Sequence, residues 1–253
     1  MSHSQHPVRI ALIGYGKMGK EVERAALERG DQVTARIDID SPSLSTDGVR
    51  EADVAIHFAT PSTVAQHVRE LAQLRKQIVL GTTGWTHEMQ NIRSIVDSAG
   101  IGLVYASNFS VGVNILYRLL REAGSLIDRF GEYDVSVHEI HHKDKLDAPS
   151  GTALSIADVL LKTIRRKTKV LAGSPSGKIL PEQLQVTSGR FGSVVGTHSV
   201  TFESSADSIE IVHTAKNRTG FALGAVVAAE WVNGKKGMFT FEEVLSDLFK
   251  QQS

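Results

Sequence analysis

Short apolar runs alternate with segments of helical periodicity through the first half of the chain. The apolar runs cover residues 8–13, 32–37, 53–59, 77–80 and 101–106. The first run is almost continuously apolar, which is typical of a strand that is buried on both faces, whereas residues 32–37 alternate between polar and apolar positions. After the first run, Met18, Val22 and Ala25 recur at helical spacing, and helices are expected to begin near Pro61 and Thr86. Strands that alternate with helices predict a parallel sheet covered on both faces.

The pattern changes after residue 108, where a second domain is expected to begin. A helix that carries Ile115 and Ile127 leads to a strand at 133–139, a polar loop and another helix from Ser150. The remaining predicted elements are antiparallel strands at 194–203 and 208–214, a long mobile loop at 173–192, which is rich in Gly, Pro and Ser, and helices at 221–232 and from Thr240 onward. The last helix is expected to begin with a capping box, because Thr240 and Glu243 have the required spacing. These strands indicate an open mixed sheet rather than a continued parallel one.

Composition and charge narrow the range of partners. The chain has 253 residues, of which 41% are hydrophobic and 22% charged, as expected for a folded chain of one or two domains. It shows no apolar stretch near the roughly 18 residues of a membrane span and no signal-peptide core in residues 1–7, so we expect a cytoplasmic protein with no membrane partner. The absence of Cys excludes thiolate chemistry, and 28 basic against 28 acidic residues favour a small-molecule partner over nucleic acid.

Gly14, Gly16 and Gly19 form a G-x-G-x-x-G pattern between the first predicted strand and the following helix. In such a loop the glycines permit a tight turn, the approach of a pyrophosphate and the close packing of helix on strand. Asp38 ends the next strand, where a carboxylate can bind the adenine ribose. A turn that serves packing alone is the alternative, but the context favours a nicotinamide dinucleotide. The glycine-flanked loop 81–84 is expected at the same sheet edge, next to the nicotinamide.

The densest polar cluster covers residues 138–152, and it begins with an H-E-x-x-H pattern at His138–His142. On a helix, two histidines at this spacing bind zinc. Residues 134–139 instead alternate with period two, and Pro149 and Gly151 follow, so we expect a strand. Residues four apart on a strand lie roughly 13 Å from one another, too far to share a metal. We therefore expect no metal site.

Cationic and hydroxyl groups converge in the same segment. Three histidines lie beside Lys143 and Lys145, and each charged neighbour raises the cost of protonating the next. Such crowding favours an anionic ligand over the alternative of a solvated surface cluster. Ser150 and Thr152 open the next helix, whose free amides form a ready carboxylate site. We expect a substrate that bears carboxylates, with Lys145 or His141 able to move a proton.

Residues 139–152, which read E-I-H-H-K-D-K-L-D-A-P-S-G-T, closely resemble the signature of the 4-hydroxy-tetrahydrodipicolinate reductase family, formerly called dihydrodipicolinate reductases. Residues 81–84, 108–114 and 221–225 resemble the nicotinamide loop, the hinge and cofactor segment, and the late helix of that family. The resemblance implies an enzyme that reduces 4-hydroxy-tetrahydrodipicolinate with NADH or NADPH in the diaminopimelate route to lysine. It further implies a cytoplasmic homotetramer that is built through the substrate domain.

The resemblance also implies roles for individual residues. His141 and Lys145 would be the catalytic pair, with Lys145 the proton donor. The residues that would bind the substrate carboxylates are His142, Lys145, Ser150, Gly151 and Thr152. The residues that would bind the cofactor are Gly14, Tyr15, Gly16, Lys17, Met18, Gly19, Asp38, Phe58, Gly81, Thr82, Thr83, Ala106, Ser107, Asn108 and Phe109.

The expected fold is therefore α/β. Residues 1–109 and 219–253 would form a Rossmann-like dinucleotide-binding domain, and residues 110–218 a second, α+β domain for substrate binding and oligomerisation on an open mixed sheet. Two other functions stay open. One is another NAD-dependent small-molecule dehydrogenase of the same two-domain plan. The other is a non-catalytic dinucleotide-sensing binder, against which the presence of both His141 and Lys145 argues.

The sequence departs from the common family pattern around the cofactor. Lys17 stands in place of an arginine, Asp38 in place of a glutamate, and His57 in place of an aspartate. Ile39 offers no cation to an adenosine 2′-phosphate, which Asp38 would repel. We therefore expect NADH to serve at least as well as NADPH, with Lys17 or Arg36 able to reverse that preference.

Overall fold

In the computed structural model, which describes residues 7–38, 44–175 and 177–250, the chain forms two compact units. Unit 1 comprises Met1–Val111 and Arg218–Ser253, and unit 2 comprises Gly112–Asn217. Unit 1 is thus discontinuous in sequence, because the chain leaves it, forms unit 2 and then returns. Across the described ranges, none of the helices combines the length and the apolar character that crossing a membrane requires.

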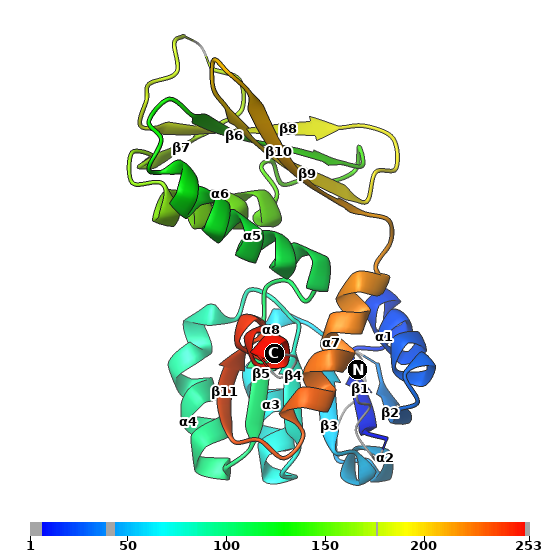
Figure 1. The fold of residues 1–253 in the computed structure, drawn as a ribbon. Coiled ribbons are helices and arrows are strands. Elements are labelled where there is room, and N and C mark those ends of the chain that lie inside the picture. Colours follow the sequence, from blue (N-terminus) through cyan, green and yellow to red (C-terminus); the bar gives the residue numbers. More distant parts are fainter. Residues whose placement is uncertain (1–6, 39–43, 176, 251–253) are drawn as a thin grey trace. The chain divides into compact units, whose positions relative to one another are not determined.

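Unit 1 is built on a six-stranded sheet in which every neighbouring pair of strands is parallel (Figure 1). Its strands are β1 (Arg9–Ile13), β2 (Gln32–Ile37), β3 (Val54–His57), β4 (Gln77–Leu80), β5 (Gly102–Tyr105) and β11 (Gly237–Thr240). Their order across the sheet is β11-β5-β4-β3-β1-β2. The winding of the sheet reverses between β1 and β3, and open parallel sheets bind ligands at that point, beyond the carboxyl ends of the strands.

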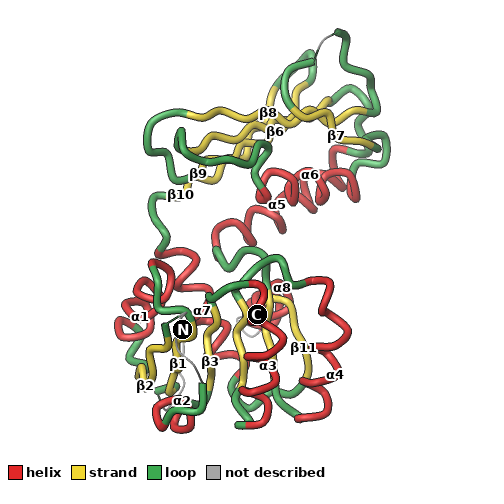
Figure 2. Tube along the Cα trace, turned by 180° about the vertical axis from the view of Figure 1, so that it is seen from behind, coloured by secondary structure: helices red, strands yellow, loops and turns green. Residues whose placement is uncertain are grey.

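Helices cover both faces of this sheet. They are α1 (Lys17–Glu28), α2 (Asp47–Glu51), α3 (Val64–Gln73), α4 (Met89–Ala99), α7 (Thr219–Val232) and α8 (Phe241–Lys250). Figure 2 shows α3 and α4 on the face of the sheet that is turned toward the viewer. One hydrophobic core joins α1, α7 and α8 to Ile10 and Leu12 of β1, and the other joins α2, α3 and α4 to Ala11 and Ile13. Alternate residues of β1 therefore enter opposite cores, which confirms the prediction of a strand buried on both faces.

Unit 2 contains a five-stranded mixed sheet in the order β10-β9-β6-β8-β7. Its strands are β6 (Asp134–His141), β7 (Lys169–Ala172), β8 (Gln183–Arg190), β9 (Gly196–Glu203) and β10 (Ser208–Ala215). β9 is antiparallel to β6 and β10, whereas β8 is parallel to β6 and β7. α5 (Val111–Ile127) and α6 (Gly151–Thr163) bury Leu120 and Leu160 in one core with Val137 and Phe202 of the sheet. The expected open mixed sheet is confirmed.

The prediction of one long loop at 173–192 was wrong. Within it, β8 lies between β6 and β7 and pairs with both. Leu184 and Val186 are its buried apolar residues, and most other positions of the strand are polar or glycine. Polar and apolar residues alternate over only four positions, 183–186, which is a short pattern for a strand of eight residues, and the neighbouring strands complete its hydrogen bonds. β7, α2 and β11 are four or five residues long and were also missed.

The last helix begins with the predicted capping box. The Glu243 amide donates to Thr240 Oγ1 at 3.2 Å, and the Thr240 amide donates to Glu243 Oε2 at 2.7 Å. These two bonds satisfy two backbone donors that the first turn of a helix would otherwise leave unpaired. This local signal therefore placed the start of α8 correctly.

Gly224 should be the least replaceable glycine of α7. A Cβ atom at this position would lie 1.8 Å from the carbonyl oxygen of Phe109. Gly224→Ala should therefore lower the free energy of unfolding by about 1–3 kcal/mol, measured by urea titration. Gly220→Ala in the same helix is the control, because its nearest neighbour would be 3.6 Å away and alanine is the better helix former. Equal effects of the two substitutions would contradict the packing argument.

Candidate functional site

The glycine loop between β1 and α1 has the steric properties that its pattern predicts. Gly14 adopts a φ of +90°, and a Cβ there would lie 2.4 Å from the carbonyl oxygen of Phe58. A Cβ on Gly19 would lie 2.7 Å from the carbonyl oxygen of Gly14, so α1 packs directly on the loop. A Cβ on Gly16 would meet nothing within 4 Å. The N-terminus of α1, whose first turn carries no acidic residue, thus offers free space and a positive dipole end to an anion.

The neighbouring strand ends complete a cavity of about 240 Å³ within unit 1. Its lining residues are Met18, Phe58, Ala59, Pro61, Gly81, Thr82 and Thr83. The Phe58 ring covers Gly81, because a Cβ on Gly81 would lie 2.2 Å from a ring carbon of Phe58. The fold therefore brings together predicted cofactor residues from three separate segments, and it adds Ala59 and Pro61, which the sequence analysis did not single out.

A cluster of charges lies at the end of β2. The Arg36 Nε donates to Glu23 Oε1 of α1 at 2.8 Å, and the Tyr15 hydroxyl also donates to the Glu23 carboxylate. The hydrogen bond from Arg36 is the main cause that lowers the pKa of Glu23. Asp38 follows β2 and is exposed, whereas Ile39 lies outside the described residues. Arg36 is therefore held by α1 beside the position expected for the adenine ribose.

Residues 106–109 follow β5 at the same edge of the sheet. The Phe109 side chain is only 2% exposed, and its ring lies 6.4 Å from that of Phe58 and 5.0 Å from that of Phe241. This ring is part of the core, which leaves the main chain of Phe109 as its means of reaching a ligand. Asn108 Oδ1 accepts a hydrogen bond from the Ser110 amide at 2.8 Å, while Ser107 is exposed and Ala106 packs partly against the core.

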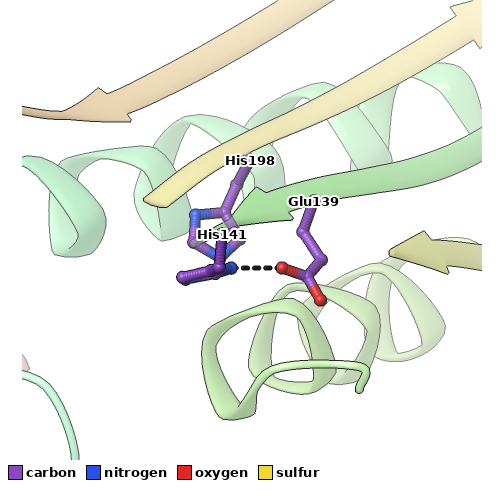
Figure 3. A group of neighbouring side chains, drawn as sticks. All are labelled: Glu139, His141 and His198. Atoms are coloured by element: carbon purple, nitrogen blue, oxygen red, sulfur yellow. Dashed lines mark hydrogen bonds and ion pairs between the residues drawn. The ribbon is translucent and has the colours of Figure 1, made fainter. Parts of the chain in front are cut away.

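In unit 2 the candidate catalytic residue His141 and a second histidine, His198, lie beside the buried carboxylate of Glu139 (Figure 3). Glu139 and His141 lie two residues apart on β6 and point to the same side of the sheet. His141 Nδ1 contacts Glu139 Oε2, and Arg190 Nη2 of β8 donates to Glu139 Oε1 at 2.7 Å. The Ser150 amide at the start of α6 donates to the same oxygen at 3.2 Å. One carboxylate therefore joins two strands and a helix start.

These contacts determine the protonation of His141. Burial alone would raise the pKa of Glu139, but the hydrogen bonds from Arg190, His141 and the Ser150 amide outweigh it and lower that pKa to about 2. An ionised carboxylate can only accept, so His141 must donate through Nδ1. Burial lowers the pKa of His141 despite Glu139, which leaves the ring neutral with a lone pair on Nε2. A Cβ on Gly196 would lie 2.9 Å from this Nε2, so glycine leaves space beside it.

Lys145 and the start of α6 lie in the same segment as His141. Lys145 Nζ donates to Asp147 Oδ1 at 2.6 Å, and the Lys145 charge contributes to the lowered pKa of His141. Ser150 caps α6 by accepting from the Ala153 amide at 3.2 Å. His142 and Thr152 are half-buried, and Gly151 is exposed at the first position of the helix. The structure thus places every predicted substrate residue between the C-terminal end of β6 and the first turn of α6.

Glu139, His141 and His198 are also the described residues that could hold a metal, with ligand atoms within 4.8 Å of one another. Both oxygens of Glu139 and His141 Nδ1 are already engaged, and His198 Nε2 lies 3.3 Å from Ser150 Oγ. The Arg190 guanidinium on Glu139 would also repel a cation. The group is better described as a hydrogen-bonded cluster. The predicted strand in place of an H-E-x-x-H helix is confirmed.

Comparison with known proteins assigns the chain to a family. Sequence models described as the N-terminus and the C-terminus of dihydrodipicolinate reductase match residues 8–109 and 112–245. The chain belongs to the dihydrodipicolinate reductase family. A 4-hydroxy-tetrahydrodipicolinate reductase of Christiangramia forsetii is 40% identical over 243 residues, which is 96% of this chain and 100% of the relative. Another, from Akkermansia muciniphila, is 36% identical and covers 91% of this chain and 94% of its own length.

Solved structures with this fold include reductases and other dehydrogenases. A dipicolinate-bound dihydrodipicolinate reductase of a Paenisporosarcina species has a TM-score of 0.76 at 23% identity, covering 94% of this chain and 99% of its own. An engineered D-amino acid dehydrogenase bound to NADP⁺ has a TM-score of 0.53 at 14% identity, covering 98% and 100%. At such identities the structures show a common fold alone. The dihydrodipicolinate reductase family, and not a general dehydrogenase plan, is what the sequence matches support, so the chain is an oxidoreductase with a nicotinamide cofactor.

Sequence reasoning missed three residues of the Glu139 cluster. It assigned no role to Glu139 itself, although a carboxylate two residues before His141 on a strand must share its face. Arg190 lies in the segment that was predicted as a loop. His198 lies in a predicted strand, but no contact was predicted for its side chain. Their contacts join positions 51 and 48 residues apart, which no local pattern reveals.

The lowered pKa of Glu139 predicts a specific dependence of stability on pH. A carboxylate with a folded-state pKa of about 2, against 4.5 for the unfolded chain, stabilises the protein fully above pH 4.5, and this stabilisation is lost as the pH falls through about 2. Glu139→Gln should therefore be less stable than wild type at pH 7, and this difference should shrink by about 2 kcal/mol between pH 7 and pH 3 as the unfolded-state carboxylate is protonated. Urea titrations from pH 7 to pH 3 will show it. A gap that is constant with pH, or one matched by Glu122→Gln on the surface, would contradict the assignment.

Proposed function

We propose that this protein reduces 4-hydroxy-tetrahydrodipicolinate to tetrahydrodipicolinate with NADH or NADPH, in the diaminopimelate route of lysine biosynthesis. One observation of the structure carries the substrate assignment. Asp147 accepts a hydrogen bond from Lys145 Nζ at 2.6 Å, and the pKa of Asp147 is lowered by Lys145 and also by the Gly151 amide. Two of the donors assigned to the substrate therefore already bind a carboxylate of the chain itself.

The carboxylate site combines a cation with a helix start. Asp147 is well exposed, with 57% of its side chain accessible, so a substrate carboxylate can replace it on Lys145 without opening the core. Ser150 is bound by the Ala153 amide and Glu139 and therefore stays in place. Dipicolinate, which the Paenisporosarcina structure contains, is a small planar dicarboxylate, the chemical class that a cation beside a helix start favours. His142, Ser150, Gly151 and Thr152 are proposed to complete it.

The proposed roles of the two catalytic residues follow from their contacts. The bound nicotinamide supplies the hydride for the substrate ring. Lys145 Nζ donates the proton that neutralises the negative charge developing on the conjugated ring system. His141, neutral and oriented through Nδ1 by Glu139, presents Nε2 as a hydrogen-bond acceptor beside the substrate. Glu139, whose side chain is fully buried, acts through His141, and Arg190 holds the Glu139 carboxylate in place.

Replacement of the proton donor tests this function. Lys145→Ala should lower kcat by about 10²- to 10⁴-fold, with the KM for NADH changed by no more than a few fold, because general acid catalysis acts on the chemical step. The assay follows NADH oxidation in the presence of 4-hydroxy-tetrahydrodipicolinate. Lys143→Ala, an exposed lysine of the same segment, is the matched control and should stay near wild type. Wild-type turnover by Lys145→Ala would refute the assigned role.

We also propose that unit 1 is the dinucleotide-binding domain and that NADH serves at least as well as NADPH. The pyrophosphate would lie on residues 14–19 and the nicotinamide beside 81–83 and 106–109. Asp38 can accept hydrogen bonds from the ribose hydroxyls but would repel a 2′-phosphate. Arg36, one of two cations that could offset this repulsion, is bound to Glu23. Lys17 is the other cation that could offset the repulsion between Asp38 and a 2′-phosphate.

Release of Arg36 should therefore change the cofactor preference. Glu23→Gln removes the charge that holds Arg36 and should raise the ratio of kcat/KM for NADPH to that for NADH by about three- to tenfold. Asp38→Ala should act in the same direction. Glu21→Gln, which affects only the exposed pair with Arg24, is the control on the same helix. A wild-type preference for NADPH of tenfold or more would overturn the role assigned to Asp38.

Two further proposals concern the state of the protein in the cell. We propose a homotetramer built through unit 2, in a cytoplasmic enzyme. The edge strand β10 supports association through unit 2, because its exposed residues include Ile209 and Val212, which are 46% and 51% accessible in the single chain. Exposed apolar residues on an unpaired edge strand favour association with another chain.

A further inference from the structure

Two histidines form a hydrogen-bonded chain behind the cavity of unit 1. His57 ends β3 and is fully buried, with 0% of its surface exposed. Its Nδ1 lies 2.8 Å from Thr82 Oγ1, and its Nε2 lies 2.9 Å from Nδ1 of His67 on α3. Both ring nitrogens of this buried side chain are therefore engaged. The chain runs from a half-buried residue of α3 to the loop that follows β4.

The charge state of His57 restricts how the protons are arranged. Burial, with a smaller contribution from His67, lowers the pKa of His57 to about 3. His57 is therefore neutral at physiological pH, carries one ring proton, and donates through one nitrogen while it accepts through the other. Burial also lowers the pKa of His67.

The surroundings of Thr82 select one of the two tautomers. When His57 Nδ1 donates to Thr82 Oγ1, the Thr82 hydroxyl can donate to the Ala59 carbonyl oxygen, 3.3 Å away, and His57 Nε2 accepts from His67. In the opposite tautomer the Thr82 hydroxyl must donate to His57, and the bond to Ala59 is lost. The first arrangement satisfies all three contacts, and buried polar groups that are left unpaired are costly.

In this arrangement the Thr82 hydroxyl is engaged by other groups of the protein. Thr82 is 6% exposed, and its carbonyl oxygen accepts from Trp85 Nε1 at 2.8 Å. With its hydroxyl bound to His57 and Ala59, the residue is held from both ends, while the exposed Thr83 lines the cavity beside it. The position of the loop main chain at 81–83 therefore depends on the histidine pair.

We propose that His57, supported by His67, is a positioning residue that orients Thr82 and thereby sets the loop 81–84 for the nicotinamide end of the cofactor. The proposal rests on the proposed cofactor site in unit 1. It assigns the contribution of Thr82 to its main chain and gives a function to two histidines outside the catalytic cluster.

The tautomer can be measured directly. In protein labelled with ¹⁵N-histidine, long-range ¹H–¹⁵N spectra distinguish a protonated Nδ1 from a protonated Nε2, and His57→Asn identifies the signal among the 10 histidines. We expect the Nδ1–H form for His57, unchanged between pH 6 and pH 8. An Nε2–H form would overturn the proposal, and this measurement does not depend on catalytic activity.

Substitutions test the effect on the cofactor. Thr82→Val removes the hydroxyl at constant shape and should raise the Kd for NADH, followed by its fluorescence, by about three- to tenfold. Thr82→Ser should restore binding to within about twofold of wild type, since it keeps the hydroxyl. His57→Asn keeps a donor near the Nδ1 position and should bind better than His57→Gln, which does not. His87→Gln, an exposed histidine of the same unit, is the control.

Two further readouts separate positioning from a general loss of structure. Binding of pyridine-2,6-dicarboxylate to the cofactor-free protein should be unchanged in every variant, because that ligand is assigned to unit 2. The double variant His57→Gln, Thr82→Val should bind NADH no more weakly than whichever single variant binds it less tightly. The reason is that both substitutions remove the same hydrogen bond between His57 and Thr82. Additive losses, or NADH affinity that is equal in all variants, would overturn the proposal. A wild-type protein that binds neither NADH nor NADPH would overturn the proposed function as well.

Discussion

The buried carboxylate of Glu139 is the interaction on which the arrangement of unit 2 depends. A charge without solvent is tolerated only when hydrogen bonds and opposite charge replace its hydration. At Glu139 these come from Arg190 on β8, His141 on β6 and the Ser150 amide at the start of α6. Because each donor belongs to a different segment, the carboxylate is satisfied only when all of them are in place. The same condition orients His141 and holds the helix start beside Lys145.

Unit 1 positions its candidate site by a different means, namely close packing of main chain and neutral side chains. Gly14 and Gly19 bring the first loop against Phe58 and α1, and Gly81 passes under the Phe58 ring. Behind the cavity, the buried and neutral His57 forms hydrogen bonds with neutral side chains and not ion pairs. Such contacts depend on shape, so an added methyl group acts more strongly there than a change in ionic strength.

The two units illustrate how function resides in sites that a common fold carries. The parallel sheet, with its winding reversed between β1 and β3, is a general dinucleotide scaffold that structures of other dehydrogenases share. What distinguishes this chain is the segment 139–152 and the strands that complete it. There, a carboxylate of the protein already lies on the donors proposed for the substrate. Assignment to a reductase family and the chemistry of this segment therefore support the same function.

Features that depend on a few neighbouring residues could be predicted from the sequence. They include the alternation of strands and helices in unit 1, the glycine loop, the capping box of Thr240 and Glu243, and the strand that excludes an H-E-x-x-H helix at His138. In each of these the determining contacts are local, or the apolar pattern repeats with the period of the element. Residues 139–152 likewise stand out in the sequence as a candidate site, because cations, hydroxyls and a helix start occur in one continuous segment.

Other features were decided only by the tertiary structure, because their causes lie far apart in the sequence. β8 forms between two strands although its own pattern is weak, and it brings Arg190 to Glu139 across 51 residues. Phe109 is drawn into the core by Phe58 and Phe241, and Arg36 is held by Glu23 of a neighbouring helix. Local periodicity reports which face of an element is apolar, but not which distant residue will meet it. The hydrogen-bond partners of Glu139, Arg36 and His57 come from distant segments. These partners are therefore decided by how whole helices and strands pack in the folded chain.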